Sequence, residues 1–133
     1  MSEEHSRPVE AEFSTSWDRV EEFYHRLFID PRWGGEWASS MLDLIAELRK
    51  RNYDRKFRAE LSRAVLILSR SREHVLRSKQ PFIEFHRDVP GSTGMSVTYH
   101  EGSETKVSIE IDKIELKPEV ETLLKRLLEC SIS

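Results

Sequence analysis

The chain has 133 residues and a formal net charge of −3, and 38% of its residues are hydrophobic while 34% are charged. This length and composition predict one folded domain that needs no disulfide or metal ion for stability, which excludes the disordered and disulfide-rich classes. No apolar run approaches the roughly 20 residues that span a bilayer. With one cysteine and no visible signal peptide, we expect a cytoplasmic protein without a membrane partner.

Charge is distributed unevenly along the chain. Residues 49–79 contain eleven of the 21 Lys and Arg residues but only three acidic residues, which gives a net charge of +8. Residues 1–48 carry −7 and residues 80–133 carry −4. The basic segment therefore indicates a surface for an acidic partner, unless the acidic arm and first helix of the chain itself neutralise it.

The N-terminal third is predicted to contain two helices. Residues 1–12 have almost no apolar side chains, and we expect a flexible acidic arm ahead of a single domain at residues 13–133. The first helix begins near Ser16, after N-cap acceptors, and ends at Asp30, which precedes a proline. A second helix is predicted over residues 36–51, with a break in the three residues that follow it.

Residues 54–77 are predicted to form a long basic helix. At about 100° per residue, an apolar stripe faces the core and consists of Phe57, Leu61, Ala64, Val65, Leu68 and Val75. A ridge of basic side chains recurs every seven residues on a different face, at Lys56, Arg63, Arg70 and Arg77. The ridge predicts contact with solvent or with an acidic surface.

Two further residues are candidates for partner contacts. Leu66 points to the side of the basic ridge, so either this helix is buried all round at its middle or Leu66 meets a partner. Trp33 follows Arg32 and precedes two glycines, and it is predicted to lie exposed in a turn. The predicted partner-binding residues are therefore Lys56, Arg63, Leu66, Arg70, Arg77 and Trp33.

After Lys79, apolar and polar residues alternate. Three strands of an antiparallel meander are predicted at residues 82–86, 95–100 and 106–111. If Phe85 opposes Val97 and Val97 opposes Ile109, one face of the sheet is apolar. The other face is polar and collects Glu84, His86, Ser96, Thr98, His100, Lys106, Ser108 and Glu110.

The last helix is predicted to begin at Pro118, a favoured first helical residue, and it carries a leucine-rich apolar stripe. The predicted fold class is α+β. Its order is three N-terminal helices, a three-stranded antiparallel meander and a C-terminal helix, with the helices on one face of the sheet.

The sequence contains no residue pattern typical of catalysis or metal binding, so no catalytic residue, metal site or cofactor is predicted. We predict a small non-enzymatic protein-interaction or regulatory protein that forms a homodimer or binds an acidic protein. Two alternatives stay open. One is nucleic-acid binding through the basic helix at 54–77. The other is a small-ligand protein or enzyme that uses the aromatic-rich N-terminal region and the histidine-bearing sheet face.

Overall fold

The protein is an α+β domain, which confirms the predicted class. The computed structural model describes residues 2–30, 32, 35–73, 80–87, 94–102 and 104–132, with side chains from residue 9 onward except Arg87. The elements are α1 (Ser2–Ile29), α2 (Gly35–Lys50), the 3₁₀ helix η1 (Tyr53–Arg55), β1 (Arg58–Ser62), β2 (Val65–Ser69), β3 (Phe82–Arg87), β4 (Met95–Glu101), β5 (Glu104–Ile111) and α4 (Pro118–Leu128). None of the helices in these ranges is long and apolar enough to cross a membrane.

The strands form one antiparallel sheet in the order β1-β2-β3-β4-β5. The predicted register is confirmed, because Phe85 pairs with Val97 and Val97 pairs with Ile109. The three predicted strands correspond to β3, β4 and β5. The sheet has two more strands than the sequence predicted, and both come from the segment that was expected to be helical.

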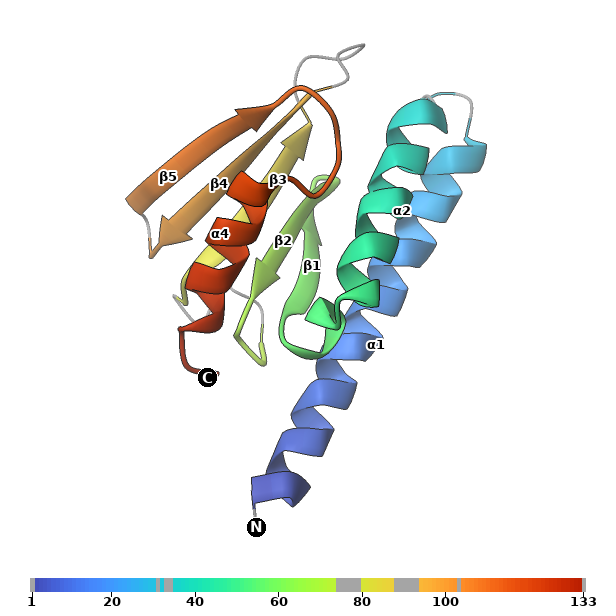
Figure 1. Ribbon diagram of the computed structural model, residues 1–133. Coiled ribbons are helices and arrows are strands. Elements are labelled where there is room, and N and C mark those ends of the chain that lie inside the picture. The colour runs from blue at the N-terminus through green and yellow to red at the C-terminus, as the bar shows by residue number, and fades with distance from the viewer. Residues whose placement is uncertain are drawn as a thin grey trace.

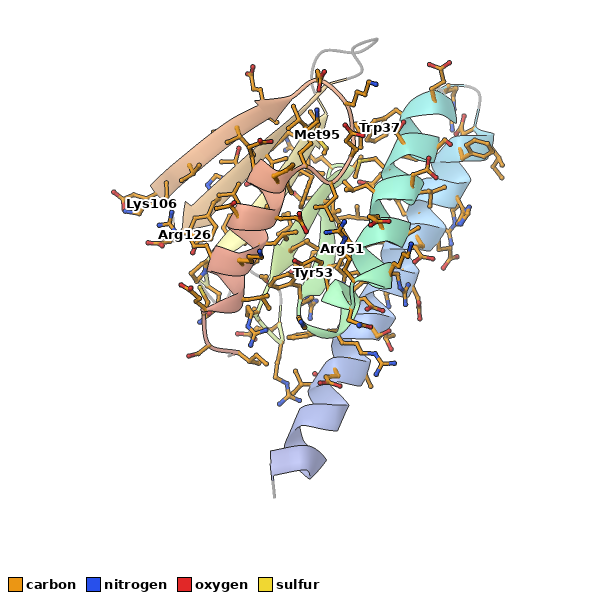
Figure 2. All side chains as sticks on the ribbon, in the orientation of Figure 1. Trp37, Arg51, Tyr53, Met95, Lys106 and Arg126 are labelled. Atoms are coloured by element: carbon orange, nitrogen blue, oxygen red, sulfur yellow. The ribbon has the colours of Figure 1, made fainter. Side chains whose placement is uncertain are left out.

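One core joins the apolar face of the sheet to all three helices. Figure 1 shows α4 lying across the sheet, with α1 and α2 packed together on the β1 side. Fully buried side chains from α1, α2, the strands and α4 belong to a single apolar cluster. Figure 2 shows Arg51 and Tyr53 between α2 and α4, where Arg51 forms an ion pair with Glu121. The sequence predicted helices on one face of the sheet, whereas α4 alone lies across that face and α1 and α2 lie on the β1 side, where they join the same core.

Helix α1 begins much earlier than the sequence predicted. We expected a flexible arm over residues 1–12, whereas the described helix begins at Ser2. Val9 and Phe13 are buried and extend the apolar stripe of α1 toward its N-terminus, eight and four residues before Trp17. These two residues place the part of α1 from Val9 onward against the domain, while the first turns of the helix extend beyond it in Figure 1.

The predicted basic helix at 54–77 is wrong. The described part of this segment holds the end of η1 and the hairpin of β1 and β2. The predicted break after the second helix is confirmed, because Asn52 adopts a left-handed φ of 66°. The hairpin turn consists of Arg63 and Ala64, whose φ angles are 50° and 68°. Such turns usually carry Asn or Gly, so this pair gave no turn signal.

Candidate anion-binding groove between helix α1 and strand β1

Helix α1 closes the outer edge of β1 with its side chains. The indole Nε1–H of Trp17 donates to the carbonyl oxygen of Phe57 at 2.8 Å. The backbone N–H of Ala59 donates to Ser16 Oγ at 2.9 Å. An edge strand leaves alternate backbone groups unpaired, and these two bonds satisfy groups of that kind. The helix is therefore fixed against the strand by direct hydrogen bonds as well as by packing.

Tyr24 adds a third bond to the same hairpin. Its hydroxyl donates to the carbonyl oxygen of Ala64, in the β1–β2 turn, at 2.8 Å. The ring packs edge-on against Phe23 and Trp37, with centroid separations of 5.4 and 5.7 Å. Burial raises the pKa of the Tyr24 phenol well above its usual value, so the hydroxyl stays protonated and remains a donor.

A cavity of about 650 Å³ lies between α1, β1 and the residues that follow β2. A smaller cavity of about 210 Å³ shares Ser16, Arg19 and Arg58 with it and extends along β1. We call the combined space the α1–β1 groove. Its charged lining residues are Glu12, Arg19, Arg58, Glu60 and Arg72.

Two of these arginines already hold carboxylates of the chain. Arg72 binds Glu12 through two hydrogen bonds of 3.1 and 2.8 Å, and this bonding lowers the pKa of the Glu12 carboxyl. Arg58 lies with its Nε 3.3 Å from Glu60, whose side chain is buried, and its Nη1 donates to the carbonyl oxygen of Arg72 at 2.9 Å. Arg58 is thereby held in one orientation in the groove.

Arg19 is the third arginine of the groove and differs from the other two. It is exposed, and within the described ranges no hydrogen bond or ion pair engages its guanidinium group. A guanidinium group has five N–H donors in a planar arrangement that suits a carboxylate or phosphate. The groove therefore contains three arginines against two carboxylates, with one arginine available to an incoming anion.

Another cavity, of about 510 Å³, shares Ala11 and Thr15 of α1 with the groove and is also lined by Glu10, Ser14 and Arg55. Arg55 is exposed and belongs to η1. A fourth arginine therefore lies beside the N-terminal half of α1, next to the groove.

The residues predicted to bind a partner do not form a ridge. Arg70 donates to the carbonyl oxygens of Cys130 and Lys56, both at 2.9 Å, so it ties β2 to the C-terminal segment and to η1. Lys56 is exposed, with its amine 6.0 Å from the centre of the Tyr53 ring. Arg63 lies in the hairpin turn at the opposite end of β2 from Arg70.

The other predicted partner contacts are Leu66, Arg77 and Trp33. Leu66 is completely buried in the main core, where the sheet replaces the helix that would have exposed it. Arg77 and Trp33 lie outside the described residues. The sequence placed Leu66 on the same surface as the basic ridge only because a helix was assumed for residues 54–77.

Part of the basic segment is neutralised by α1. Arg49 binds Asp18 at 2.9 Å and Glu21 at 2.6 Å, both on α1, and Asp54 at 3.2 Å. With the Arg72–Glu12 pair, this agrees with the interpretation that the acidic N-terminal region compensates the basic segment. The basic residues that remain available are fewer than the charge count suggested.

His86 and His100 lie on the polar sheet face, as predicted, and they share one carboxylate. Glu84 lies between them, with its Oε1 2.9 Å from Nε2 of His100. Thr105 Oγ1 lies 3.2 Å from the other ring nitrogen of His100. In the described ranges no group of three or more His, Cys, Asp or Glu side chains is placed to hold a metal ion. None of these residues lines the α1–β1 groove.

Sequence reasoning missed the groove because its parts come from three segments. Glu12, Ser16 and Arg19 follow one another at helical spacing, and this was the only local signal. Arg58 and Arg72 reach the same space only when β1 and β2 form a hairpin. In comparisons with protein-family models, curated proteins and solved structures, no match to this chain was found. The groove itself is therefore the observation from which a function can be inferred.

Proposed function

We propose that this chain is a non-enzymatic binding protein that takes an acidic segment of another protein into the α1–β1 groove. The observation that carries the proposal is the placement of Arg19, Arg58 and Arg72 around one cavity of about 650 Å³. Arg19 has no counter-ion among the described residues. Arginines stay protonated at neutral pH, so the groove favours holding a negative charge over transferring protons.

The Arg72–Glu12 pair supports a carboxylate as the ligand group. Glu12 presents its carboxylate to Arg72 in a two-bond geometry that an acidic residue of a partner would reproduce. The side chains of both residues are about half exposed, at 47% and 50%. Exposed ion pairs are weak, at roughly 0–1 kcal/mol, so an incoming carboxylate can replace Glu12.

The acids in the groove favour a protein over a nucleic acid. Glu12 and Glu60 lie among the three arginines, and a phosphate backbone with a charge at about every 1.7 Å would meet both of them. A peptide whose acidic side chains are spaced apart can match the arginines and avoid the glutamates. The net charge of −3 points in the same direction, because it does not attract a polyanion at long range.

The test is fluorescence anisotropy with a fluorescein-labelled oligoglutamate peptide at low salt. Replacing the free arginine, Arg19→Glu, should weaken binding by roughly tenfold, because one guanidinium–carboxylate contact becomes a repulsion. Arg26→Glu is the matched control. It makes the same charge change on the same helix, at a residue that pairs with Glu22 and does not line the groove.

Equal losses for the two variants would show a nonspecific charge effect and would contradict the proposal. Single-stranded DNA is the second probe. If DNA bound more tightly than the peptide and lost affinity steeply with salt, nucleic acid would replace protein as the partner. Arg63→Glu adds a comparison with the earlier ridge hypothesis, since Arg63 lies in the turn and outside the groove lining.

A further inference from the structure

Strand β5 is the open edge of the sheet. It is the last strand in the order and, among the described strands, pairs with β4 alone, and Figure 1 shows it along the outer side of the sheet. Most of its residues are exposed, while Val107 and Ile109 are half-buried. The opposite edge, β1, is covered by α1. An open edge strand presents unpaired backbone donors and acceptors that another strand can pair with.

The backbone groups that face outward from β5 follow from the sheet register. The two-residue turn after Ser62 makes Ser62 and Val65 a hydrogen-bonded pair, and such pairs alternate along antiparallel strands. Carrying this alternation through the sheet directs the N–H and C=O groups of Ser108 and Glu110 away from β4. The outward N–H of Ala59, which meets Ser16, agrees with the same alternation at the other edge.

The two halves of β5 differ in how they are protected against pairing. The first half carries a register irregularity opposite Tyr99 and His100, and Lys106 projects from this end in Figure 2. Bulges and lysines both discourage edge pairing. From Val107 to Ile111 the register is regular, and apolar side chains alternate with Ser108 and Glu110. This second half is the part suited to receive another strand.

We propose that two copies of the chain pair β5 with β5, antiparallel about a two-fold axis at Ile109, to form one continuous ten-stranded sheet. This register centres the contact on the regular segment. It sets Ile109 against itself and Val107 against Ile111 of the second copy, so the half-buried apolar side chains gain cover. It also sets Lys106 opposite Asp112 of the second copy at both ends and places no like charges opposite each other.

The dimer has a consequence that rests on the proposed function. Its two α1–β1 grooves lie at the two ends of the joined sheet, because β1 is the strand farthest from β5. Nine strand spacings of about 4.8 Å separate the two β1 strands by about 43 Å before twist is considered. The dimer would therefore hold two acidic segments of an oligomeric or repetitive partner, which raises avidity without further contacts.

Sedimentation velocity over a concentration series tests the dimer. The wild-type chain should sediment as a dimer, and Ser108→Pro should raise the dissociation constant on the order of 100-fold, because two outward N–H groups are lost across the two-fold axis. Ser108→Ala keeps the N–H and should remain dimeric. A monomeric wild type, or a Ser108→Pro variant that dimerises normally, would overturn the proposal.

Cross-linking tests the register without relying on the proline variant. In a Cys130→Ser background, which removes the native free thiol, Ile109→Cys should form a disulfide-linked dimer on oxidation. Facing residues of a pair that lacks hydrogen bonds have Cα atoms about 4.5 Å apart, within disulfide range. Val107→Cys should not cross-link to itself, because its two copies lie about 14 Å apart. Cross-linking of neither variant, or of both equally, would refute the register. Because the proposed function is tested by peptide binding, its failure is distinguishable from failure of the dimer.

Discussion

Strands β1 and β5 lie at opposite edges of the same sheet, but their surroundings differ. Along β1, side chains of α1 bond the outward backbone groups of Phe57 and Ala59. Along β5, exposed polar residues and a register irregularity are the protection within one chain. The difference shows two ways to manage an edge strand. The β1 edge is covered by side chains that lie about 40 residues away in the sequence. The β5 edge is protected by its own residues, or it can be covered by a second strand.

The comparison also separates two roles. At β1 the covering helix leaves cavities beside it, and the arginines of the strand, the helix and the segment after β2 gather there. At the other edge, β5 is the last strand of the sheet, and no further strand of the described residues pairs with it. The outer edge of β5 is therefore the available surface. We therefore propose ligand binding at the β1 edge and self-association at the β5 edge. Substitutions at the two edges are expected to differ in their effect on the free energy of unfolding.

The largest effect is expected from Trp17→Ala. This indole is fully buried and donates to Phe57, so its removal leaves a cavity and an unpaired carbonyl oxygen at the β1 edge. The free energy of unfolding should fall by about 3–5 kcal/mol in urea titrations followed by circular dichroism. Phe28→Ala is the control, since Phe28 is an aromatic residue of the same helix that is 49% exposed, and it should cost far less. Similar losses for both would mean that α1 does not close this edge.

A matched pair of proline substitutions compares the edges directly. Ala59→Pro removes the backbone N–H that donates to Ser16 Oγ, and it places a proline ring against α1. The free energy of unfolding should therefore fall by about 3 kcal/mol. Ser108→Pro removes an outward N–H that no other strand in the described part of the chain uses. In dilute protein, where the chain is monomeric, it should change the unfolding free energy by less than about 0.5 kcal/mol. Equal costs would show that the two edges are equally covered.

Ser16→Ala should have an intermediate effect. The variant keeps the packing of α1 but leaves the Ala59 N–H without its acceptor, which should cost about 1 kcal/mol. Thr15→Ala is the neighbouring control, because Thr15 is exposed and lines the groove. Its unfolding free energy should stay within about 0.5 kcal/mol of wild type. A larger loss for Thr15→Ala than for Ser16→Ala would contradict the role of Ser16.

Elements with a clear local period were predictable from the sequence. Helix α2, helix α4 and strands β3 to β5 were found, and the register was fixed by the need to bury Phe85, Val97 and Ile109 on one face. The β1–β2 hairpin was missed because its apolar residues also fit a helical stripe. Its turn, Arg63-Ala64, has the positive φ angles of a tight hairpin without the usual residues. Packing against the rest of the fold, rather than the local sequence period, selects the hairpin over a helix.

The groove was less predictable than the fold. Arg58 and Arg72 were counted within a helix, and Arg19 lies in a segment whose net charge is strongly acidic. The groove exists because α1 lies along β1, and that contact depends on Ser16 and Trp17 reaching backbone groups of a strand that was not predicted. Net charge along the chain therefore indicated that charges were segregated, but it did not show where they meet.

At Tyr24 the expected effect depends on alkaline pH. Burial raises the pKa of this phenol, so the folded protein holds the proton more tightly than the unfolded chain does. The stabilisation is complete below about pH 10 and is lost as the pH rises toward the pKa of the folded state.

Tyr24→Phe should lower the free energy of unfolding by about 1 kcal/mol at neutral pH, because it loses the hydrogen bond to Ala64. Above pH 10 it should lose stability less steeply than wild type, because phenylalanine has no proton to release. The pKa values of Tyr53 and Tyr99 are also raised by burial, so some decline should remain in the variant. Parallel pH profiles in urea titrations would show that the Tyr24 hydroxyl is not held at the β1–β2 turn.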